Sequence, residues 1–313
     1  MSGQSSSAHT PNSLPPERDA HPAYDKSTRP ATASGSLVFV ATPIGNLGDI
    51  SERALATLRN ADILLCEDTR VTGKLLQAYG ITTSTQTLHD HNEQERIPFL
   101  LGRLHDGARI AAVSDAGTPM LSDPGYRLAR AAIAENIPVS GVPGPNAAAL
   151  ALTLSGLPPQ PYMFLGFPPP RSQARRENFA TLRAAEQAGL HATLIWYEAP
   201  HRLQDTLEDL EAVFGTARDA AVGRELTKRF EEMVRGNIPA LRSHFSTTAP
   251  RGEITLLLGP PAEDDNGAAD LDDHLRQALA THSVKDAATL VAGFINLPRR
   301  TVYARALELA KKA

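Results

Sequence analysis

Three loops rich in glycine and proline follow segments that have the apolar composition of buried strands. They are residues 41–49 (ATPIGNLGD), 114–119 (SDAGTP) and 142–147 (VPGPNA). Glycine lets a backbone approach a ligand closely, and proline fixes the shape of a loop before binding. Because ligands of open α/β sheets bind beyond the carboxyl ends of the strands, the three loops together predict a pocket for a medium-sized cofactor.

The same loops exclude the common phosphate-bearing cofactors. The chain has no phosphate-cradling pattern that ends in Gly-Lys-Ser/Thr, and residues 45–48 (GNLG) lack the full glycine fingerprint of dinucleotide sites. A cofactor without phosphates remains, and S-adenosylmethionine fits that description. Each loop alone has the composition of an ordinary turn, so the prediction rests on the three together.

Acidic side chains at the end of a further apolar segment, 63–66, are candidates for proton transfer. We favour Glu67 and Asp68 as the catalytic pair because they stand at the presumed rim of the cofactor pocket. The alternative is that residues 67–70 (EDTR) form a helix cap with a local ion pair. The other candidates are His89, His91, Glu198 and Glu225. A general base contributes about 10²–10⁴-fold in rate and orientation of the reactants roughly 7–11 kcal/mol, so positioning is the larger expected effect.

Basic side chains form groups that are candidates for nucleic-acid contact. Several of them fall near one face of an expected helix after residue 170, and others follow an expected strand near residue 224. The RNA-binding candidates are Arg70, His89, Arg171, Arg175, Arg176, Arg224 and Lys228. As phosphate contacts they would give salt-dependent binding without sequence information. The alternative is that they are solvated surface residues.

Composition bounds the class of protein. With 313 residues, 42% of them hydrophobic, the chain can bury a sizeable core, and the net charge of −4 does not by itself indicate nucleic-acid binding. The single cysteine, Cys66, rules out an internal disulfide and fits a reducing compartment. We find no metal-ligand spacing, secretory signal or membrane-length apolar run. We therefore expect a cytoplasmic protein without metal or membrane contact.

Alternation of short apolar strands with amphipathic helices predicts an α/β fold with a mainly parallel sheet in the first half. The expected strands are 37–41, 63–66, 109–113 and 138–142, and the expected helices are 49–58, 69–79, 92–104, 124–135 and 145–154. The second half has strands at 162–167, 192–197, 220–224, 231–235 and 253–258, and helices at 171–187 and 200–214. Since it has less helix between its later strands, we expect a mixed sheet there.

Changes in composition mark five parts of the chain. They are a disordered tail (1–35), an N-terminal α/β domain (36–157), a C-terminal α/β domain (158–260), a linker (261–273) and a helix-turn-helix-like module (274–313). The module has helices at 284–292 and 299–311 around residues 293–298 (GFINLP), and after residue 273 basic residues outnumber acidic ones. It is either a nucleic-acid contact or a stabilising helical cap.

Seven motifs, in order, resemble those of one family. They are 41–47 (ATPIGNL), 66–70 (CEDTR), 88–93 (LHDHNE), 113–119 (VSDAGTP) with 122–125 (SDPG), 142–145 (VPGP), 197–202 (YEAPHR) and 223–228 (GRELTK). This series is similar to the small-subunit ribosomal RNA methyltransferase I family, within the tetrapyrrole-methylase-like superfamily. The resemblance covers roughly residues 36–260, and the helical appendix also resembles that family's C-terminal module.

The resemblance implies an S-adenosylmethionine-dependent enzyme that methylates the ribose 2′-oxygen of cytidine 1402 in 16S ribosomal RNA of the small subunit. It implies two α/β domains of the tetrapyrrole-methylase type with the cofactor cleft between them, and a homodimer. The cofactor-binding residues carried over by motif are Pro43, Gly45, Asp115, Gly117, Thr118, Leu121, Ser122, Asn146, Ala147, Tyr197 and Ala199.

Two other functions stay open at this point. One is a methylase of the same superfamily that acts on a small molecule such as a corrin precursor; the basic helical appendix and the Arg-rich helix argue against it. The other is a non-catalytic RNA-binding or ribosome-assembly factor, which binding of S-adenosylmethionine would exclude.

Overall fold

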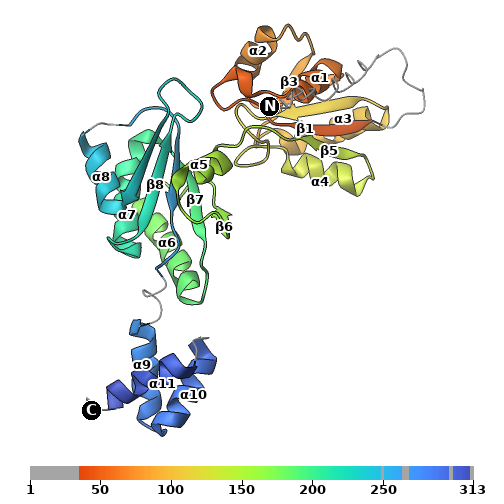
Figure 1. The fold of residues 1–313 in the computed structure, drawn as a ribbon. Helices are drawn as coiled ribbons and strands as arrows, with labels where there is room; N and C mark the ends of the chain where they lie inside the picture. The colour runs from red at the N-terminus through yellow and green to blue at the C-terminus, as the bar shows by residue number, and fades with distance from the viewer. Residues whose placement is uncertain (1–34, 248–249, 263–267, 296–298, 311–313) are drawn as a thin grey trace, which may run out of the picture. The chain divides into compact units, whose positions relative to one another are not determined.

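The structure is a computed structural model that describes residues 35–247, 250–262, 268–295 and 299–310. The expected disordered tail, the turn residues 296–298 and the basic residues Lys311 and Lys312 lie outside the described residues. No helix among those described is long and apolar enough to cross a membrane. Figure 1 shows the elements in chain order.

The first sheet has five parallel strands in the order β3-β2-β4-β1-β5. Its strands are β1 (Ser36–Val40), β2 (Ile63–Cys66), β3 (Thr85–Thr87), β4 (Arg109–Val113) and β5 (Val139–Val142). Helices α1 (Glu52–Asn60), α2 (Thr69–Ala78), α3 (Glu93–His105) and α4 (Tyr126–Ala134) and the 3-10 helix η2 (Leu47–Asp49) connect them. The predicted parallel sheet is confirmed.

Side chains alternate between the two faces of this sheet, and its central strands are buried on both faces because helices pack against each one. Leu65 of β2 packs in one cluster with residues of α3 and α4, whereas its neighbour Leu64 packs in another with residues of α1 and α2. Parallel strands buried on both faces read as continuous apolar runs, which is why the sequence of β2 predicted its bounds.

The second sheet is mixed, with strand order β6-β7-β10-β8-β9. Its strands are β6 (Tyr162–Phe164), β7 (Thr193–Glu198), β8 (Asp219–Arg224), β9 (Glu232–Asn237) and β10 (Ile254–Leu258). β6 runs parallel to β7, while β10 pairs antiparallel with both β7 and β8, and β9 antiparallel with β8. The predicted mixed sheet is confirmed.

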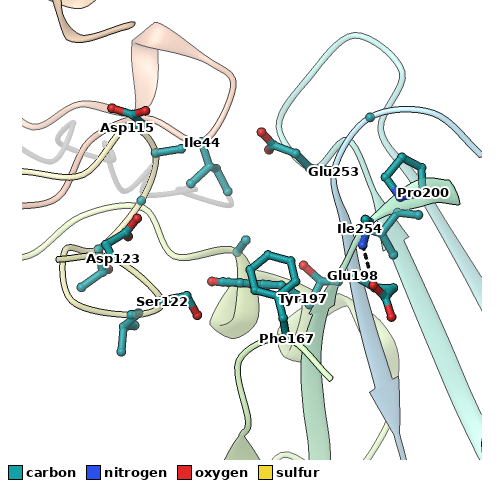
Figure 2. A pocket seen from close by; sticks show the side chains of 18 residues that line it. Ile44, Asp115, Ser122, Asp123, Phe167, Tyr197, Glu198, Pro200, Glu253 and Ile254 are labelled. Carbon is teal, nitrogen blue, oxygen red and sulfur yellow. Dashed lines mark hydrogen bonds between the residues drawn. The ribbon is translucent and has the colours of Figure 1, made fainter. Parts of the chain in front are cut away.

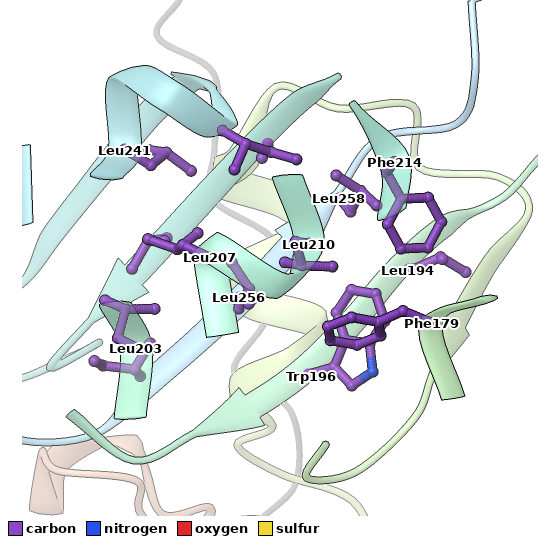
Figure 3. Packing of buried hydrophobic residues seen from close by; sticks show 14 of the residues in the cluster. Phe179, Leu194, Trp196, Leu203, Leu207, Leu210, Phe214, Leu241, Leu256 and Leu258 are labelled. Carbon is purple, nitrogen blue, oxygen red and sulfur yellow. The ribbon is translucent and has the colours of Figure 1, made fainter. Parts of the chain in front are cut away.

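Helices α6 (Ser172–Gln187), α7 (Leu203–Phe214) and α8 (Ile238–Thr247) contribute to one core on the second sheet. Phe179 and Trp196 are fully buried there, with ring centroids 5.6 Å apart in an edge-to-face arrangement (Figure 3). Burial of one such side chain stabilises the fold by about 1.5–3 kcal/mol. This core holds β7 in place, and β7 ends at the site described below.

Helix α5 (Ala147–Ser155) corrects the predicted domain boundary between residues 157 and 158. Its residues Ala148, Ala151 and Leu152 pack in one cluster with Ile195 of β7 and with residues of β8 and β10. The helix therefore belongs by its contacts to the second sheet, although it directly follows the last ligand loop of the first.

The C-terminal part has three helices within the described residues, where two were predicted. They are α9 (Ala268–Leu279), α10 (Val284–Ile295) and α11 (Arg299–Ala310). α9 begins inside the segment 261–273, which was predicted to be a linker, so that prediction is wrong from residue 268 onward. The three helices share a core of their own that includes Leu275, Val291 and Val302.

Candidate active site

A cavity of about 370 Å³ lies where loops of both sheets meet, a size usual for a small-molecule site. Figure 2 shows Asp115 and Asp123 on one side of it, with Tyr197 and Glu253 facing them. The lining residues are Ile44, Asp115, Ala116, Gly117, Thr118, Leu121, Ser122, Asp123, Ala147, Phe167, Tyr197, Glu198, Ala199, Pro200, Gly252, Glu253, Ile254 and Thr255.

Hydrogen bonds join the three glycine- and proline-rich loops on the first side of the cavity. Thr42 and Gly117 exchange backbone hydrogen bonds of 2.9 and 3.1 Å, which ties the loop after β1 to the loop after β4. The Thr118 hydroxyl donates to the Pro145 carbonyl at 3.2 Å and accepts from the Asn146 amide at 3.3 Å. The third loop is thereby fixed to the second.

Gly117 is required at the centre of this junction. Its φ of +82° lies in the left-handed region, which side chains other than glycine rarely adopt. A Cβ at this position would also lie 3.2 Å from Cγ2 of Ile44, which lines the cavity. A larger residue would therefore both strain the loop and reduce the space for a ligand.

The opposite wall is formed by the ends of β7 and β10 and by Phe167. Tyr197 packs edge-to-face on Phe164 at 4.7 Å and on Phe167 at 5.8 Å between ring centroids, and burial raises the pKa of its hydroxyl. The buried carboxylate of Glu198 accepts the Ala199 amide at 2.7 Å and pairs with Arg202 at 3.2 Å. Glu198 therefore holds the turn that presents Ala199 and does not serve as a free base.

The lining of the cavity combines apolar surface with negative charge. Ile44, Leu121, Phe167 and Ile254 supply apolar groups, and no Lys, Arg or His is among the lining residues that the structure describes. A phosphate or a polycarboxylate would thus enter without a cationic partner, which is costly in a partly buried site. The cavity is suited to a ligand that carries an apolar ring and a positive charge.

Four carboxyl groups from three strand ends influence one another beside the cavity. Burial, together with the carboxylates of Glu67, Asp115 and Asp90, raises the pKa of Asp123 to about 7. Partial burial, followed by the carboxylates of Asp115, Asp90 and Asp68, raises the pKa of Glu67. No group of three or more His, Cys, Asp or Glu residues, among those described, is arranged to hold a metal ion. Asp123 belongs to the motif 122–125 but was not among the predicted site residues.

The structure corrects the predicted catalytic role of Asp68. Its side chain accepts the Arg70 backbone amide at 2.8 Å, which caps α2, and pairs with the Arg70 guanidinium at 2.6 Å. The hydrogen bonds from Arg70 lower the pKa of Asp68 to about 2. The helix-cap alternative is therefore correct for Asp68, and a carboxylate so acidic is a poor proton acceptor. Glu67 is exposed and does not line the cavity.

Eight of the eleven residues predicted to bind the cofactor line the cavity. The other three are not among the lining residues. Pro43 precedes Ile44, and Gly45 packs against the side chain of Lys228. Asn146 caps α5 by accepting the Ala149 amide at 2.9 Å. The lining residues 252–255 were not predicted, because no glycine- and proline-rich loop at the end of an expected strand marks them in the sequence.

Among the predicted RNA contacts, Arg175 is wrong. Its side chain is only 2% exposed and pairs with the equally buried Asp209 at 2.6 Å, so it cannot reach a phosphate. Arg176 pairs with the same carboxylate but is 50% exposed, and Arg171 lies exposed immediately before α6. The spacing placed these arginines near one face, but that face is partly turned into the core.

The remaining basic candidates differ in how they are held. Arg70 is 88% exposed beside Asp68. Arg224 pairs with Glu232 at 2.8 Å, and Lys228 pairs with Glu225 at 2.6 Å. Nδ1 of His89 is buried without a hydrogen-bond partner among the described residues. Of these, Arg70 has the side chain most open to a polyanion.

Two family models match the chain. The model described as "Tetrapyrrole (Corrin/Porphyrin) Methylases" matches residues 36–242, and the one described as "RsmI C-terminal HTH domain" matches residues 265–310. Together they cover the first sheet, the second sheet except β10, and the C-terminal helices.

Curated relatives named "Ribosomal RNA small subunit methyltransferase I" are similar over most of their length. The relative from Mesorhizobium japonicum is 44% identical over 88% of this chain and 92% of its own. The relative from Escherichia coli O157:H7 is 41% identical over 88% of this chain and 96% of its own.

Solved structures share the fold at low sequence identity. A diphthine synthase aligns with a TM-score of 0.56 at 16% identity, over 72% of this chain and 90% of its own. The cobalt precorrin-4 methyltransferase involved in cobalamin biosynthesis aligns with a TM-score of 0.53 at 17% identity, over 72% of this chain and 94% of its own. These likenesses concern the fold alone.

Proposed function

This chain belongs to the tetrapyrrole methylase family and is a methyltransferase of the ribosomal RNA small subunit methyltransferase I group, and we propose that it transfers a methyl group from S-adenosylmethionine to a ribose 2′-hydroxyl of 16S ribosomal RNA. The cytidine numbered 1402 is the proposed target. The substrate is the assembled small subunit, so the proposed place of action is the cytoplasm. The expected homodimer stays a prediction.

One observation carries the choice of cofactor. The cavity offers apolar groups and carboxylates without a cation among its described lining residues. S-adenosylmethionine has an apolar adenine ring, a positively charged sulfur and no phosphate, so it matches this lining where nucleotide cofactors do not. When bound, it supplies an already activated methyl group, so that neither a metal nor a covalent enzyme intermediate is needed.

The residues that line the cavity have different proposed roles in binding the methyl donor. Phe167, Leu121 and Ile254 provide apolar surface for the adenine ring. Gly117 and Thr118 present backbone and hydroxyl groups to the polar ends of the ligand. Ala147 opens space beside them because its side chain is small. Since the orientation of two reactants contributes roughly 7–11 kcal/mol, holding the donor in one pose is the main task of these residues.

Proposed RNA contacts lie on exposed basic residues outside the cavity. Arg70, Arg171 and Arg176 are exposed on the two α/β parts, and Lys285, Arg299 and Arg300 are exposed on α10 and α11. As phosphate contacts they would position the subunit without reading its sequence. The target base is then selected by the shape of the subunit together with access to the cavity.

The decisive experiment measures transfer of labelled methyl from S-adenosylmethionine to isolated small subunits and to naked 16S RNA. We expect 2′-O-methylcytidine at one position in the subunits and little label in naked RNA. Ala147→Trp, which fills the cavity, should abolish transfer, whereas Ala149→Trp on the exposed side of α5 should not. Label in a tetrapyrrole acceptor instead of RNA would support the small-molecule alternative. Absence of S-adenosylmethionine binding in calorimetry would support the assembly-factor alternative.

A further inference from the structure

Asp123 occupies a distinct place in the cavity. It lines the cavity on the side of the loop after β4, beside Asp115 and across from Tyr197 (Figure 2). Among the described residues, no hydrogen bond or ion pair holds its carboxyl group, whereas Asp115 accepts the Asp68 backbone amide at 3.1 Å. Asp123 is therefore free to exchange a proton with a bound molecule.

Carboxylates surround Asp123, and no Lys, Arg or His is among the described residues that line the cavity beside it. The charged and titratable groups around it are Glu67, Asp90, Asp115 and Tyr197, with His89 close to Glu67 and Glu253 close to Tyr197. Burial first, and then the carboxylates of Glu67, Asp115 and Asp90, bring the pKa of Asp123 to about 7. A proton acceptor works best when its pKa lies near the operating pH.

We propose that Asp123 accepts the proton that the ribose 2′-hydroxyl loses during methyl transfer. We also propose that a positive charge on the sulfur of the bound methyl donor favours the ionised form of Asp123. This inference rests on the proposed function. It assigns to Asp123 the role that the sequence predicted for Glu67 and Asp68.

The balance of the step explains the coupling. The 2′-oxygen forms a bond to the methyl carbon, the bond from that carbon to sulfur breaks, and the sulfur keeps the electron pair and becomes neutral. The hydroxyl proton passes to a carboxylate oxygen of Asp123. One positive charge disappears from sulfur as one negative charge disappears from Asp123, so the net charge of the cavity does not change.

The interaction between the charge on sulfur and the charge on Asp123 also affects binding of the methyl donor, before methyl transfer begins. A cationic sulfur favours ionised Asp123 and lowers its pKa, whereas the neutral sulfur of S-adenosylhomocysteine does not. By linkage, the cationic donor binds ionised Asp123 more tightly, by tenfold for each unit that it lowers the pKa. The preference for donor over product should therefore increase as the pH rises through 7.

Calorimetry of the full chain with S-adenosylmethionine and with S-adenosylhomocysteine, between pH 6 and pH 8.5, tests this directly. Both ligands carry the same amino and carboxyl groups, so the ratio of their dissociation constants isolates the charge on sulfur. We expect the preference for the methyl donor to rise about tenfold over this range in the wild type, and to stay within twofold in Asp123→Asn. A ratio that does not change with pH in the wild type would overturn the proposal.

Glu67→Gln is the matched control because Glu67 belongs to the acidic group but does not line the cavity. Removal of its charge should move the pH response to lower pH and leave the response itself intact. If Glu67→Gln abolishes the response while Asp123→Asn keeps it, the proton resides on Glu67 and the assignment is wrong.

A single-turnover assay on small subunits tests the catalytic part. At saturating methyl donor, Asp123→Asn should slow transfer by about 10²–10⁴-fold and remove the rise of the rate with pH. A loss of less than tenfold would overturn the role of Asp123 in the reaction. If the wild type transfers nothing to small subunits, the proposed function fails, and the binding ratios still decide whether Asp123 follows the charge on sulfur.

Discussion

The aliphatic stem of Lys228 lies against Gly45, so that a Cβ placed on Gly45 would fall 2.3 Å from Cγ of Lys228. The ammonium group of the same lysine pairs with Glu225 at 2.6 Å and with Glu253 at 3.1 Å. Glu253 and the neighbour of Gly45, Ile44, both line the cavity. Lys228 thus connects the first ligand loop to an acidic residue on the opposite wall.

Gly45→Ala should weaken binding of S-adenosylmethionine by about five- to thirtyfold, measured by calorimetry. The new methyl group displaces Lys228 and strains a backbone with φ of +153°, and strain of this kind costs about 1–2 kcal/mol.

The double variant Gly45→Ala with Lys228→Ala separates the two causes. Removal of the lysine side chain relieves the collision but not the strain, so the penalty of Gly45→Ala should shrink in that background. Equal penalties in both backgrounds would show that the contact between Gly45 and Lys228 has no effect on the cavity.

Arg175→Ala should lower the free energy of unfolding by about 3 kcal/mol in urea titrations, because it leaves the carboxylate of Asp209 buried with one partner fewer. Arg176→Ala should cost less than about 1 kcal/mol, since that side chain is half exposed. An equal stability cost for both arginines would contradict their assignments.

In RNA binding, Arg176 should matter more than the buried Arg175. Arg176→Glu should weaken binding of the small subunit and leave the affinity for the methyl donor unchanged.

Asp123→Asn should stabilise the protein without ligand by about 1–2 kcal/mol at pH 8 and by less at pH 5. Solvent partly screens the half-buried carboxylate, which keeps this gain small. The pKa of Asp123 is raised from 3.8 to about 7 in the folded chain. Between these values the folded state binds a proton that the unfolded state has released, so the wild type loses stability as the pH rises. Thermal unfolding at both pH values measures the difference, and a gain that is larger at pH 5 would contradict this sign.

The double variant Arg299→Ala with Arg300→Ala should weaken binding to the small subunit and leave donor affinity unchanged. If each arginine contacts one phosphate, the slope of log affinity against log salt should fall by about 0.7–0.9 per residue. Arg53→Ala with Arg103→Ala is the control, because it removes the same charge from exposed positions of α1 and α3. Equal losses in the two double variants would point to net charge instead of a contact by the C-terminal helices.

Much of the fold was predictable because strands buried on both faces are continuous apolar runs. β2 and β4 have the bounds that the sequence predicted. β3, with the sequence TQT, is short and polar, and only its pairing with β2 makes it a strand. α8 did carry a signal, since Ile238, Leu241 and Phe245 have helical spacing, but it stands close behind β9 and was not assigned.

The sequence predicted the loops that form the site, but it did not predict the burial or the proton affinity of individual charged residues. Glycine and proline identified the three loops because their conformational effects are local. The burial of Arg175 depends on Asp209, which lies 34 residues away on another helix. The proton affinity of Asp123 depends on Glu67 and Asp90, which follow other strands. Interactions of this kind arise only when the chain has folded.

The start of α5 has a consequence for communication within the enzyme. Asn146 caps the helix and bonds to Thr118, Ala147 lines the cavity, and Ala151 packs on the second sheet. One short stretch of backbone is therefore shared by the ligand site and by the core of the second sheet. Binding of the methyl donor should slow amide hydrogen exchange along α5. The exchange rate of this helix would then show whether the donor is bound.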